Sequence, residues 1–326
     1  MLNPGSAITW GILGTGMIAK KFTTDLPHSE TGRLGAVSSR TQESADRFAS
    51  EFGGRGIVGY DALLADPEID AVYLALPNGL HREMAIAAMR LGKHVLCEKP
   101  ITLQASEFEA LETAAVDAGR LCAEAYMIVH HPQFIRAREL VQGGAIGRLR
   151  HVDCVFSFNN AEAVGDIRNR PETGGGGLRD IGVYAFGAAR FVSGQEPVSI
   201  PYANLTFEND VDVFAHVAAE FPDFSYGAVV SIRMQPRQSI TFHGDTGFLT
   251  LTCPFNANVH DVAELVLEND GQRIVTERWP AVNQYVLQVE NFEASAATGA
   301  SYPCPLSFSR GTQEMMDMVF TAGKCT

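Results

Sequence analysis

The glycine-rich turn Gly14-Thr15-Gly16-Met17-Ile18-Ala19 constrains the fold of this chain more than any other feature of its sequence. It follows an apolar run, residues 8–13, that is typical of a buried strand, and it opens a segment with helical character, residues 17–26. Gly14 suits the tight turn, Gly16 lets a pyrophosphate approach the backbone, and Ala19 lets helix and strand pack closely. This context predicts a Rossmann dinucleotide-binding domain, and a tight turn without a ligand is the alternative.

The segments that follow alternate between strand and helix. We expect further strands at residues 33–38, 70–76, 94–97 and 121–125, with helices between them. Residues 70–76 (DAVYLAL) are apolar throughout, which is typical of a strand buried on both faces of a parallel sheet. Thr41 is expected to cap one helix, with Glu43 in its first turn, and Thr102 to cap another that runs to about residue 118. These segments predict an NAD(P)-binding domain over residues 1–125.

The pattern changes after residue 125. A helix at residues 132–141 and a strand at 148–158 precede a glycine run, residues 174–177, and a helix at 178–192. Most later segments alternate as antiparallel strands, and Asp270-Gly271 is a strong hairpin signal. Further strands are expected at 211–221, 225–234, 239–242, 248–252, 264–267 and 273–277, and helices at 284–297 and 313–320. The fold class is therefore α/β, with a second α+β domain over residues 126–326 on a largely antiparallel, open sheet.

The strand at residues 211–221 shows how this second sheet is expected to be buried. Val211 and Val213 alternate with Asp212 and Phe214, which places Asp212 on the opposite face from the valines. Such a sheet buries one face against its own helices, and Phe214, Met234 and similar residues could leave a second apolar face. Burial of both faces within one subunit is the alternative, and a strict monomer in sedimentation at micromolar concentration would support it.

The end of the second strand bears on the choice of cofactor. An NAD-binding chain usually carries Asp or Glu there, to accept hydrogen bonds from the ribose 2′-hydroxyl. This chain has Ser38, Ser39 and Arg40 instead. Two hydroxyls and a guanidinium suit a 2′-phosphate, so we expect NADP(H), with NAD as the alternative if Arg40 is only a solvated residue.

Two further segments lie at carboxyl ends of parallel strands, where doubly wound sheets bind ligands. Leu76-Pro77-Asn78-Gly79-Leu80-His81 follows one strand, and Cys97-Glu98-Lys99-Pro100 follows the next. The candidate cofactor-binding residues are Gly14, Thr15, Gly16, Met17, Ile18, Ser38, Ser39, Arg40, Leu76, Pro77, Asn78, His81, Glu98 and Lys99.

The turn, Pro77-Asn78-x-x-His81 and Glu98-Lys99-Pro100 together closely resemble the Gfo/Idh/MocA oxidoreductase family. The resemblance extends through Glu124-Ala-Tyr-Met127, His131-Pro132-Gln133 and the segment from Gly174 through Asp180 to Tyr184. Within the family the chain is most similar to the branch of glucose–fructose oxidoreductase, NADP-dependent xylose dehydrogenase and dimeric dihydrodiol dehydrogenase. It departs from that branch at Ile128-Val129, where aromatic and basic residues are common.

The resemblance implies that Lys99, Asp180 and Tyr184 form the catalytic group. Asp180 and Tyr184 are four residues apart, which places them on one face of an α-helix. A neighbouring Lys favours the phenolate of a tyrosine. Tyr184, helped by Lys99, would then take the proton of a sugar hydroxyl while a hydride leaves the same carbon. Whether Lys99 or Tyr184 is the base stays open, and a core role for Tyr184 is the alternative.

The polar loop before the glycine run supplies candidate substrate contacts. Asn160 and Arg168 are placed to meet substrate hydroxyls, and a solvated loop is the alternative reading. We expect no metal, because no His, Asp, Glu or Cys cluster has ligand spacing. The six cysteines form no CxxC pair.

Charge and composition exclude some classes of partner. The net charge is −13 with no basic run, which argues against nucleic-acid binding. No signal segment or membrane-spanning run is visible, so we expect a cytoplasmic protein. The resemblance implies a homodimer or homotetramer.

The function predicted is an NADP(H)-dependent oxidoreductase acting on a sugar or polyol. A trans-dihydrodiol dehydrogenase is an alternative within the same class. A non-catalytic NADP(H)-binding sensor on the same fold is an alternative from another class.

Overall fold

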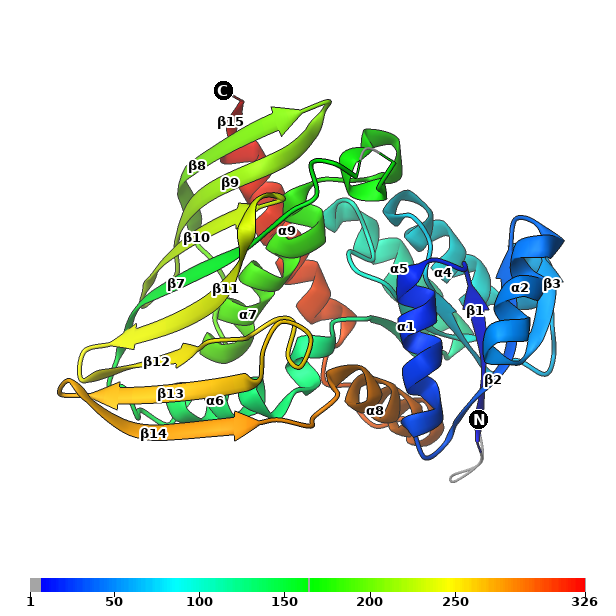
Figure 1. Cartoon of the computed structure of the whole chain (residues 1–326), viewed down its shortest axis with the longest axis horizontal. Helices are drawn as coiled ribbons and strands as arrows, with labels where there is room; N and C mark the ends of the chain where they lie inside the picture. The colour runs from blue at the N-terminus through cyan, green and yellow to red at the C-terminus, as the bar shows by residue number, and fades with distance from the viewer. Residues whose placement is uncertain (1–6, 164, 326) are drawn as a thin grey trace. The chain divides into compact units, whose positions relative to one another are not determined.

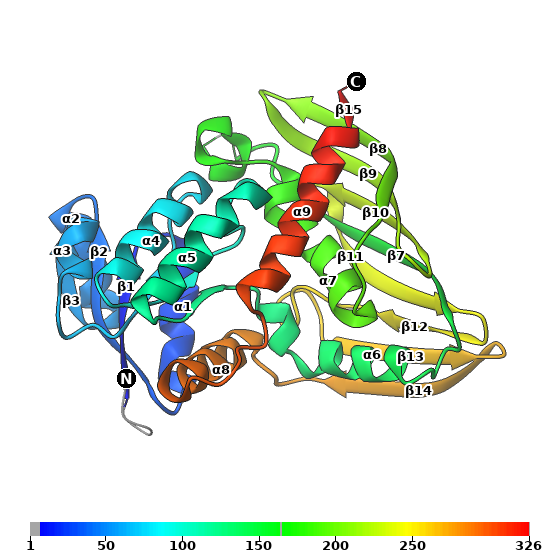
Figure 2. The same ribbon diagram turned by 180° about the vertical axis from the view of Figure 1, so that it is seen from behind.

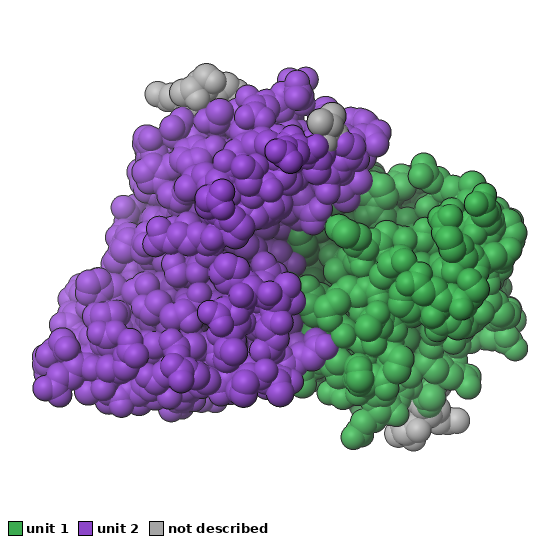
Figure 3. Space-filling view, viewed as in Figure 1, with its two compact units in different colours: residues 1–127, 285–309 green, residues 128–284, 310–326 purple. Residues whose placement is uncertain are grey.

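The computed structural model describes residues 7–163 and 165–325. The chain divides into two compact units, residues 1–127 with 285–309, and residues 128–284 with 310–326 (Figure 3). The first division lies two residues after the boundary expected from the sequence. Residues 285–309, which the sequence assigned to the second domain, pack with the first unit.

The first unit contains a six-stranded parallel sheet with the order β3-β2-β1-β4-β5-β6, the doubly wound order expected of a Rossmann fold. The fold class predicted for this part of the chain is confirmed. The strands are β1 (Ile8–Leu13), β2 (Gly32–Ser39), β3 (Arg55–Val58), β4 (Ala71–Leu74), β5 (His94–Cys97) and β6 (Cys122–Glu124). The helices are α1 (Met17–Asp25), α2 (Gln42–Phe52), α3 (Tyr60–Leu64), α4 (His81–Arg90), α5 (Phe108–Ala118) and α8 (Gln284–Thr298).

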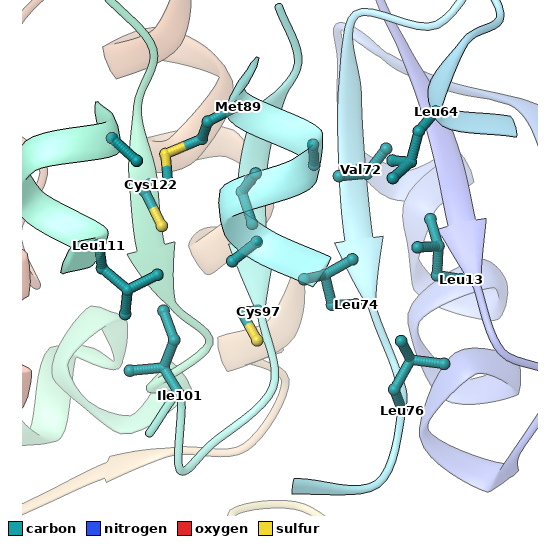
Figure 4. Packing of buried hydrophobic residues seen from close by; sticks show 14 of the residues in the cluster. Leu13, Leu64, Val72, Leu74, Leu76, Met89, Cys97, Ile101, Leu111 and Cys122 are labelled. Atoms are coloured by element: carbon teal, nitrogen blue, oxygen red, sulfur yellow. The ribbon is translucent and has the colours of Figure 1, made fainter. Parts of the chain in front are cut away.

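Both faces of this sheet are buried, as the apolar run at residues 70–76 predicted. On one face Val72 and Leu74 of β4 pack in a cluster that includes Met89 of α4 and Leu111 of α5 (Figure 4). On the other face Tyr73 stacks on Phe22 of α1 at 4.0 Å between ring centroids. Neighbouring residues of one strand therefore serve opposite faces, as the two-residue period of a strand requires.

Helix α8 closes the aromatic face of the first unit. The carboxylate of Glu293 accepts hydrogen bonds from Trp10 Nε1 at 2.7 Å and from the Ser29 and Thr31 hydroxyls, each at 2.6 Å. Trp10 also packs against Phe292 with ring centroids 5.3 Å apart. A segment remote in sequence therefore completes the core of the dinucleotide-binding fold.

One predicted helix cap is confirmed and one is wrong. Thr41 caps α2 by accepting a hydrogen bond from the Ser44 amide, with Glu43 in the first turn. Thr102 caps nothing: it is buried, and the helix begins later, after a short 3₁₀ turn, Ala105–Glu107. Gln104 and Glu107 form a reciprocal capping box there, which satisfies the free amides that Thr102 was expected to meet.

The second unit contains a nine-stranded sheet with the order β14-β13-β12-β11-β7-β10-β9-β8-β15. Its pairs are antiparallel except β10 with β7 and β15 with β8, so the predicted, largely antiparallel α+β domain is confirmed. The strands are β7 (Leu149–Asn159), β8 (Ser199–Glu208), β9 (Val211–Glu220), β10 (Ser225–Ser231), β11 (Arg233–Gly244), β12 (Gly247–Leu251), β13 (Ala263–Asn269), β14 (Gln272–Trp279) and β15 (Lys324–Cys325). The helices are α6 (Pro132–Gln142), α7 (Val183–Ser193) and α9 (Leu306–Ala322).

Helices α6 and α7 and the later part of α9 lie along one face of this sheet (Figures 1 and 2). The residues facing them, such as Ala215 and Val217 of β9, are buried, whereas His216 between them is exposed. Self-association through the uncovered face stays a prediction.

Several details of the second unit differ from the sequence expectations. Strand β8 was missed, and the run expected at residues 225–234 is two strands, because β10 ends at Ser231 and β11 begins at Arg233. Asp212, which alternates with the valines of β9, is buried, with 2% of its surface exposed. The hairpin at Asp270-Gly271 is confirmed, since both residues have the positive φ angles, 49° and 71°, that a type I′ turn requires.

Within residues 7–163 and 165–325, no helix is both long and apolar enough to cross a membrane. The same residues contain no group of three or more His, Cys, Asp or Glu side chains arranged to hold a metal ion.

Candidate active site

The turn between β1 and α1 has the geometry that a pyrophosphate needs. Gly14 has a φ of +102°, and a Cβ there would lie 2.4 Å from the Ala75 carbonyl oxygen. A Cβ on Gly16 would meet nothing within 4 Å, so space is open in front of the α1 N-terminus. No side chain caps that N-terminus, and Ala19 is fully buried. Free amides, the helix dipole and open space together fit an anionic dinucleotide.

Strand register brings the other candidate segments to the same edge of the sheet. Leu13 at the end of β1 pairs with Ser38 of β2 and with Leu74 of β4. Leu74 in turn pairs with Cys97 of β5. The residues that follow these strands therefore emerge side by side, as predicted for the carboxyl edge of a doubly wound sheet.

Ser38, Ser39 and Arg40 differ in orientation. Ser38 is fully buried, and its hydroxyl lies 3.5 Å from the carbonyl oxygen of Ile12 in the neighbouring strand β1. The side chain of Ser38 is therefore directed towards β1. Ser39 is the last residue of β2, and Arg40 after it is exposed. Arg40 is therefore the residue of the three that is exposed, and its guanidinium can meet an anion at the strand end.

His81 occupies an interior position. It is fully buried, and its Nδ1 and Nε2 atoms each lie 2.8 Å from a backbone carbonyl oxygen, of Pro100 and Leu76 respectively. Burial lowers the pKa of His81, whereas the two carbonyl contacts raise it. Each ring nitrogen thus faces a backbone carbonyl oxygen, and because a neutral imidazole carries one N–H, His81 donates to one of the two and packs between the loop after β4 and the loop after β5.

Lys99 lies half-buried beside two carboxylates of its own unit. The Glu98 carboxylate accepts hydrogen bonds from the Tyr73 hydroxyl and, at 3.3 Å, from the Lys99 amide. Glu124 of β6 is buried and accepts the Ile101 amide at 2.9 Å. Burial raises the pKa of Glu124, and the charge of Lys99 is among the groups that oppose this rise. Lys99 is therefore a half-buried lysine with the Glu98 and Glu124 carboxylates nearby.

Asp180 and Arg168, two of the residues predicted from sequence, are in direct contact. Arg168 Nε lies 2.6 Å from Asp180 Oδ2, and Arg168 Nη1 also contacts Asp166 at 3.3 Å. Burial lowers the pKa of Arg168, but the carboxylates of Asp180 and Asp166 outweigh it and raise the pKa above its ordinary value. This pair fixes the Asp180 carboxylate at the start of the helix that carries Tyr184.

That helix does not begin as the regular α-helix that the sequence predicted. Residues Leu178–Gly182 form a π-helical turn, and α7 follows from Val183. A π-helical turn has a wider hydrogen-bonded ring than an α-helix and is frequent at functional sites. Asp180 and Tyr184 are thus related through a wider turn, and not by the simple α-helical face that their spacing suggested.

Tyr184 is nearly buried among aromatic rings. Its ring centroid lies 6.2 Å from that of Phe156 and 6.1 Å from that of Phe255, and those two phenylalanines stack at 4.6 Å. Gln133 and Gln284 donate to backbone carbonyls of the loop that carries Phe255. The side-chain oxygen of Gln238 accepts the backbone amides of Phe255 and Asn256 in the same loop. The loop against Tyr184 is therefore fixed by three buried glutamines.

Asn160 belongs to a polar network next to the Arg168 loop. Arg233 donates to the Asn160 side-chain oxygen at 2.7 Å and to Asn169 at 2.9 Å. The Nδ2 atom of Asn160 is buried and has no hydrogen-bond partner among the described residues. It remains a candidate donor to a substrate hydroxyl.

Family models match both parts of the chain. Residues 8–126 match the model of the oxidoreductase family with an NAD-binding Rossmann fold, Gfo/Idh/MocA, and residues 134–250 match a C-terminal domain of the same family. The chain belongs to the Gfo/Idh/MocA family of oxidoreductases.

Relatives within this family match over nearly the full length. An uncharacterised oxidoreductase of Rhizobium meliloti is 35% identical, over 96% of each chain. D-xylose 1-dehydrogenase (NADP(+)) 2 of Haloferax volcanii is 33% identical, over 97% of each chain. The crystal structure of a 3-ketoreductase from Actinomadura kijaniata with NADP and TDP-benzene matches with a TM-score of 0.91 and 29% identity, over 98% of this chain and 99% of that chain.

Two residues of the site environment escaped sequence reasoning. Asp212 was read as one polar residue of an alternating strand, and the signal that it is buried is absent from a single sequence. Gln238 stands in a polar stretch, residues 233–239, that suggests exposure, although the side chain is buried. In contrast, Gln133 and Glu124 lie in motifs that carried the resemblance, and only their contacts were unknown.

Proposed function

We propose that this chain is an NADP(H)-dependent oxidoreductase that transfers a hydride between a hydroxyl-bearing carbon of a sugar or polyol and nicotinamide. The observation that carries the proposal is the Arg168–Asp180 pair, which fixes a carboxylate at the start of the helix that presents a nearly buried tyrosine, Tyr184. The full-length similarity to an NADP-dependent xylose dehydrogenase supports the class of substrate.

The residues that would hold the cofactor are those at the carboxyl edge of the first sheet. The amides at Gly14–Gly16 and the α1 N-terminus would bind the pyrophosphate, and Arg40 would bind the 2′-phosphate. When bound, the nicotinamide supplies or accepts the hydride. The absence of Asp or Glu at the end of β2 and the NADP of the ketoreductase structure support NADP(H) over NAD(H).

The chain's own residues would manage the proton and the orientation of the substrate. In the oxidative direction, Tyr184 would take the hydroxyl proton as the C–H bond breaks and the C=O bond forms. The ammonium of Lys99 would stabilise the negative charge that develops on oxygen. Asp180, held by Arg168, would accept hydrogen bonds from a neighbouring hydroxyl, and Asn160 Nδ2 would donate one. In the reductive direction Tyr184 returns the proton.

A steady-state assay tests this function directly. NADP⁺ reduction is measured with a panel of aldoses and polyols, and NADPH oxidation with keto sugars, including nucleotide-linked ones. Lys99→Ala and Tyr184→Phe should each lower kcat by about 10²-fold or more, as expected for loss of a proton-transfer or charge-stabilising group. Lys20→Ala is the matched control, because Lys20 is an exposed lysine that pairs with Glu51.

Two results would contradict the proposal. One is turnover that survives both Lys99→Ala and Tyr184→Phe. The other is tight NADPH binding without turnover of any substrate in the panel, which would favour a sensor on the same fold. Turnover confined to trans-dihydrodiols would keep the reaction class and change the substrate.

A further inference from the structure

A buried carboxylate with no role in the reaction described above lies beneath the glycine run. Asp212 is the second residue of β9, and only 2% of its surface is exposed. A carboxylate in such a position is costly to bury unless hydrogen bonds compensate the lost water. Its partners therefore indicate what it stabilises.

The partners of Asp212 are backbone groups at the start of the helix that carries Asp180 and Tyr184. Asp212 Oδ2 accepts the Leu178 amide at 2.6 Å. The Gly177 amide is also a hydrogen-bond partner of the carboxylate. Helix N-termini have free amides that no residue of the helix can satisfy, and here a neighbouring strand supplies the acceptor.

Gly176 shows how closely the carboxylate approaches this turn. A Cβ at Gly176 would lie 2.1 Å from Asp212 Oδ1, and the residue has a φ of +116°. The opposite side of the glycine run is held by the loop that carries Arg168, since the Gly176 and Gly175 amides donate to the carbonyls of Arg168 and Arg170. The glycine run is thus held on one side by Asp212 and on the other by the Arg168 loop.

We propose that Asp212 is a positioning residue for the reaction, because its ionised carboxylate fixes the turn at residues 174–178 and so aims Asp180 and Tyr184. This inference rests on the roles proposed for those two residues. Asp212 acts through the helix start and touches neither substrate nor cofactor.

The protonation of Asp212 gives this role a measurable signature. Burial raises the pKa of Asp212 to about 7, against the opposing hydrogen bonds of Leu178 and Gly177 and the charge of Arg179, the charged side chain that acts on it. Because the folded pKa lies above the unfolded one, the stability contributed by Asp212 is present in acid and is lost as pH rises towards 7. The ionised form that fixes the helix start is therefore the form that destabilises the fold.

Asp212→Asn separates positioning from a purely structural role. The asparagine imitates the protonated acid, and its amide nitrogen cannot accept the second backbone N–H. At about pH 8 we expect kcat to fall about 10- to 100-fold while KM for NADP⁺ changes less than about twofold. The ratio of wild-type to variant kcat should shrink towards one as pH falls to about 6, where wild-type Asp212 is itself protonated.

Two further measurements complete the test. The melting temperature of Asp212→Asn at about pH 8 should equal or exceed that of wild type, because the variant removes a buried charge. Hydrogen–deuterium exchange at residues 174–184 should be faster in Asp212→Asn than in wild type at the same alkaline pH. Asp210→Asn is the matched control, because Asp210 is an exposed aspartate in the turn before β9.

The outcomes decide between the two roles. A pH-independent kcat ratio together with a lower melting temperature would overturn the proposal and leave Asp212 a structural residue. Unchanged exchange at residues 174–184 would overturn it as well. If wild type turns over no substrate, the proposed function fails, and the exchange measurement still decides whether Asp212 fixes the helix start.

Discussion

Ser38 and Arg40 lie two residues apart at the end of β2, yet one is buried and the other is exposed. Ser38 points into the sheet and Arg40 lies exposed beyond the strand end, next to Tyr60. Burial raises the pKa of Tyr60 and the charge of Arg40 opposes this, so the guanidinium lies near the Tyr60 hydroxyl. The exposed guanidinium of Arg40 forms no ion pair with residues 7–163 or 165–325, so it is available to a phosphate.

Replacing Arg40 should therefore discriminate between the two cofactors. Arg40→Ala should raise KM for NADP⁺ about tenfold or more, because a charge-assisted hydrogen bond of about 1.5–3 kcal/mol is lost, and leave KM for NAD⁺ unchanged. Steady-state kinetics with both cofactors measures this. Arg47→Ala, at an exposed arginine on α2, should affect neither value. An equal rise for NADP⁺ and NAD⁺ would show that Arg40 does not bind the 2′-phosphate.

Sequence reasoning at this scale identified residue types more reliably than orientations. Lys99 and Asp180 were singled out by motif and spacing and Arg168 by its place in a polar loop, and the structure pairs Asp180 with Arg168. Ser38 and Asp212 are both buried, and the sequence alone does not show this: a strand alternates faces, but a single sequence does not say which face a polar residue takes. Only the packing of neighbouring strands and turns decides that.

The conformation of the glycine run before α7, residues 174–177, is likewise explained by the segments that pack against it. The four consecutive glycines have specific neighbours: the amides of Gly174, Gly175 and Gly176 each donate to a backbone carbonyl of residues 168–171. Gly175 would clash with carbonyls of the Arg168 loop, and Gly176 with Asp212, if either carried a Cβ. The run is glycine-rich because two polypeptide segments pack against it.

Gly176→Ala tests this reading of the turn. The positive φ and the contact with Asp212 should lower the free energy of unfolding by at least about 2 kcal/mol and reduce kcat. Urea denaturation and initial rates measure the two effects. Gly165→Ala is the control, since a Cβ at Gly165 meets nothing within 4 Å. Equal stability of the two variants would mean that the turn relaxes without cost.

Secondary structure was predictable where local patterns are strong. Strands β1 and β5 were predicted residue for residue, since their apolar runs are bounded by turn residues. Strand β8 was missed although its second half, residues 203–208, alternates apolar and polar side chains, a pattern typical of a half-buried strand. The π-helical turn has no local signal in the sequence, and Asp212 of β9 and the Arg168 loop contact the residues where it begins.

For the whole molecule, buried histidines set the response to acid. Burial lowers the pKa of His94 and His131 to about 4 each and of His130 to about 3. Their folded pKa values lie below the unfolded value, so the stability they contribute is present at neutral pH and lost as pH falls from about 6.5 towards 4. The raised pKa values of Asp212, Glu124 and Glu290 act in the opposite sense, whereas the lowered pKa of His81 adds to the effect of the three histidines.

We therefore expect acid-induced unfolding below about pH 6. The free energy of unfolding should fall by up to about 1.4 kcal/mol per histidine for each pH unit in this window. Urea titrations between about pH 7 and pH 4 measure the slope. His94→Gln should reduce it, because glutamine can still accept the Leu121 amide without titrating, whereas His28→Gln, at an exposed site, should not. A stability independent of pH would exclude this mechanism.

The two-part organisation was predictable from the change in periodicity near residue 125, but the path of the chain was not. Helix α8 reads as an ordinary amphipathic segment, and nothing local shows that Glu293 meets Trp10, Ser29 and Thr31. Long-range hydrogen bonds of this kind are visible only once both partners are placed in space.

Because residues 285–309 belong to the first unit, that unit can complete its fold only after most of the second unit has been synthesised. Domains usually fold as they leave the ribosome, amino-terminal part first, at about 5–20 residues per second. Here the aromatic side of the dinucleotide fold stays uncovered until α8 emerges, roughly 10–40 s after residue 127 at that rate. The nascent chain would thus lack the contacts of Trp10 with Phe292 and Glu293 while strands β7–β14 are being made, and this interval is when assistance from chaperones would matter most.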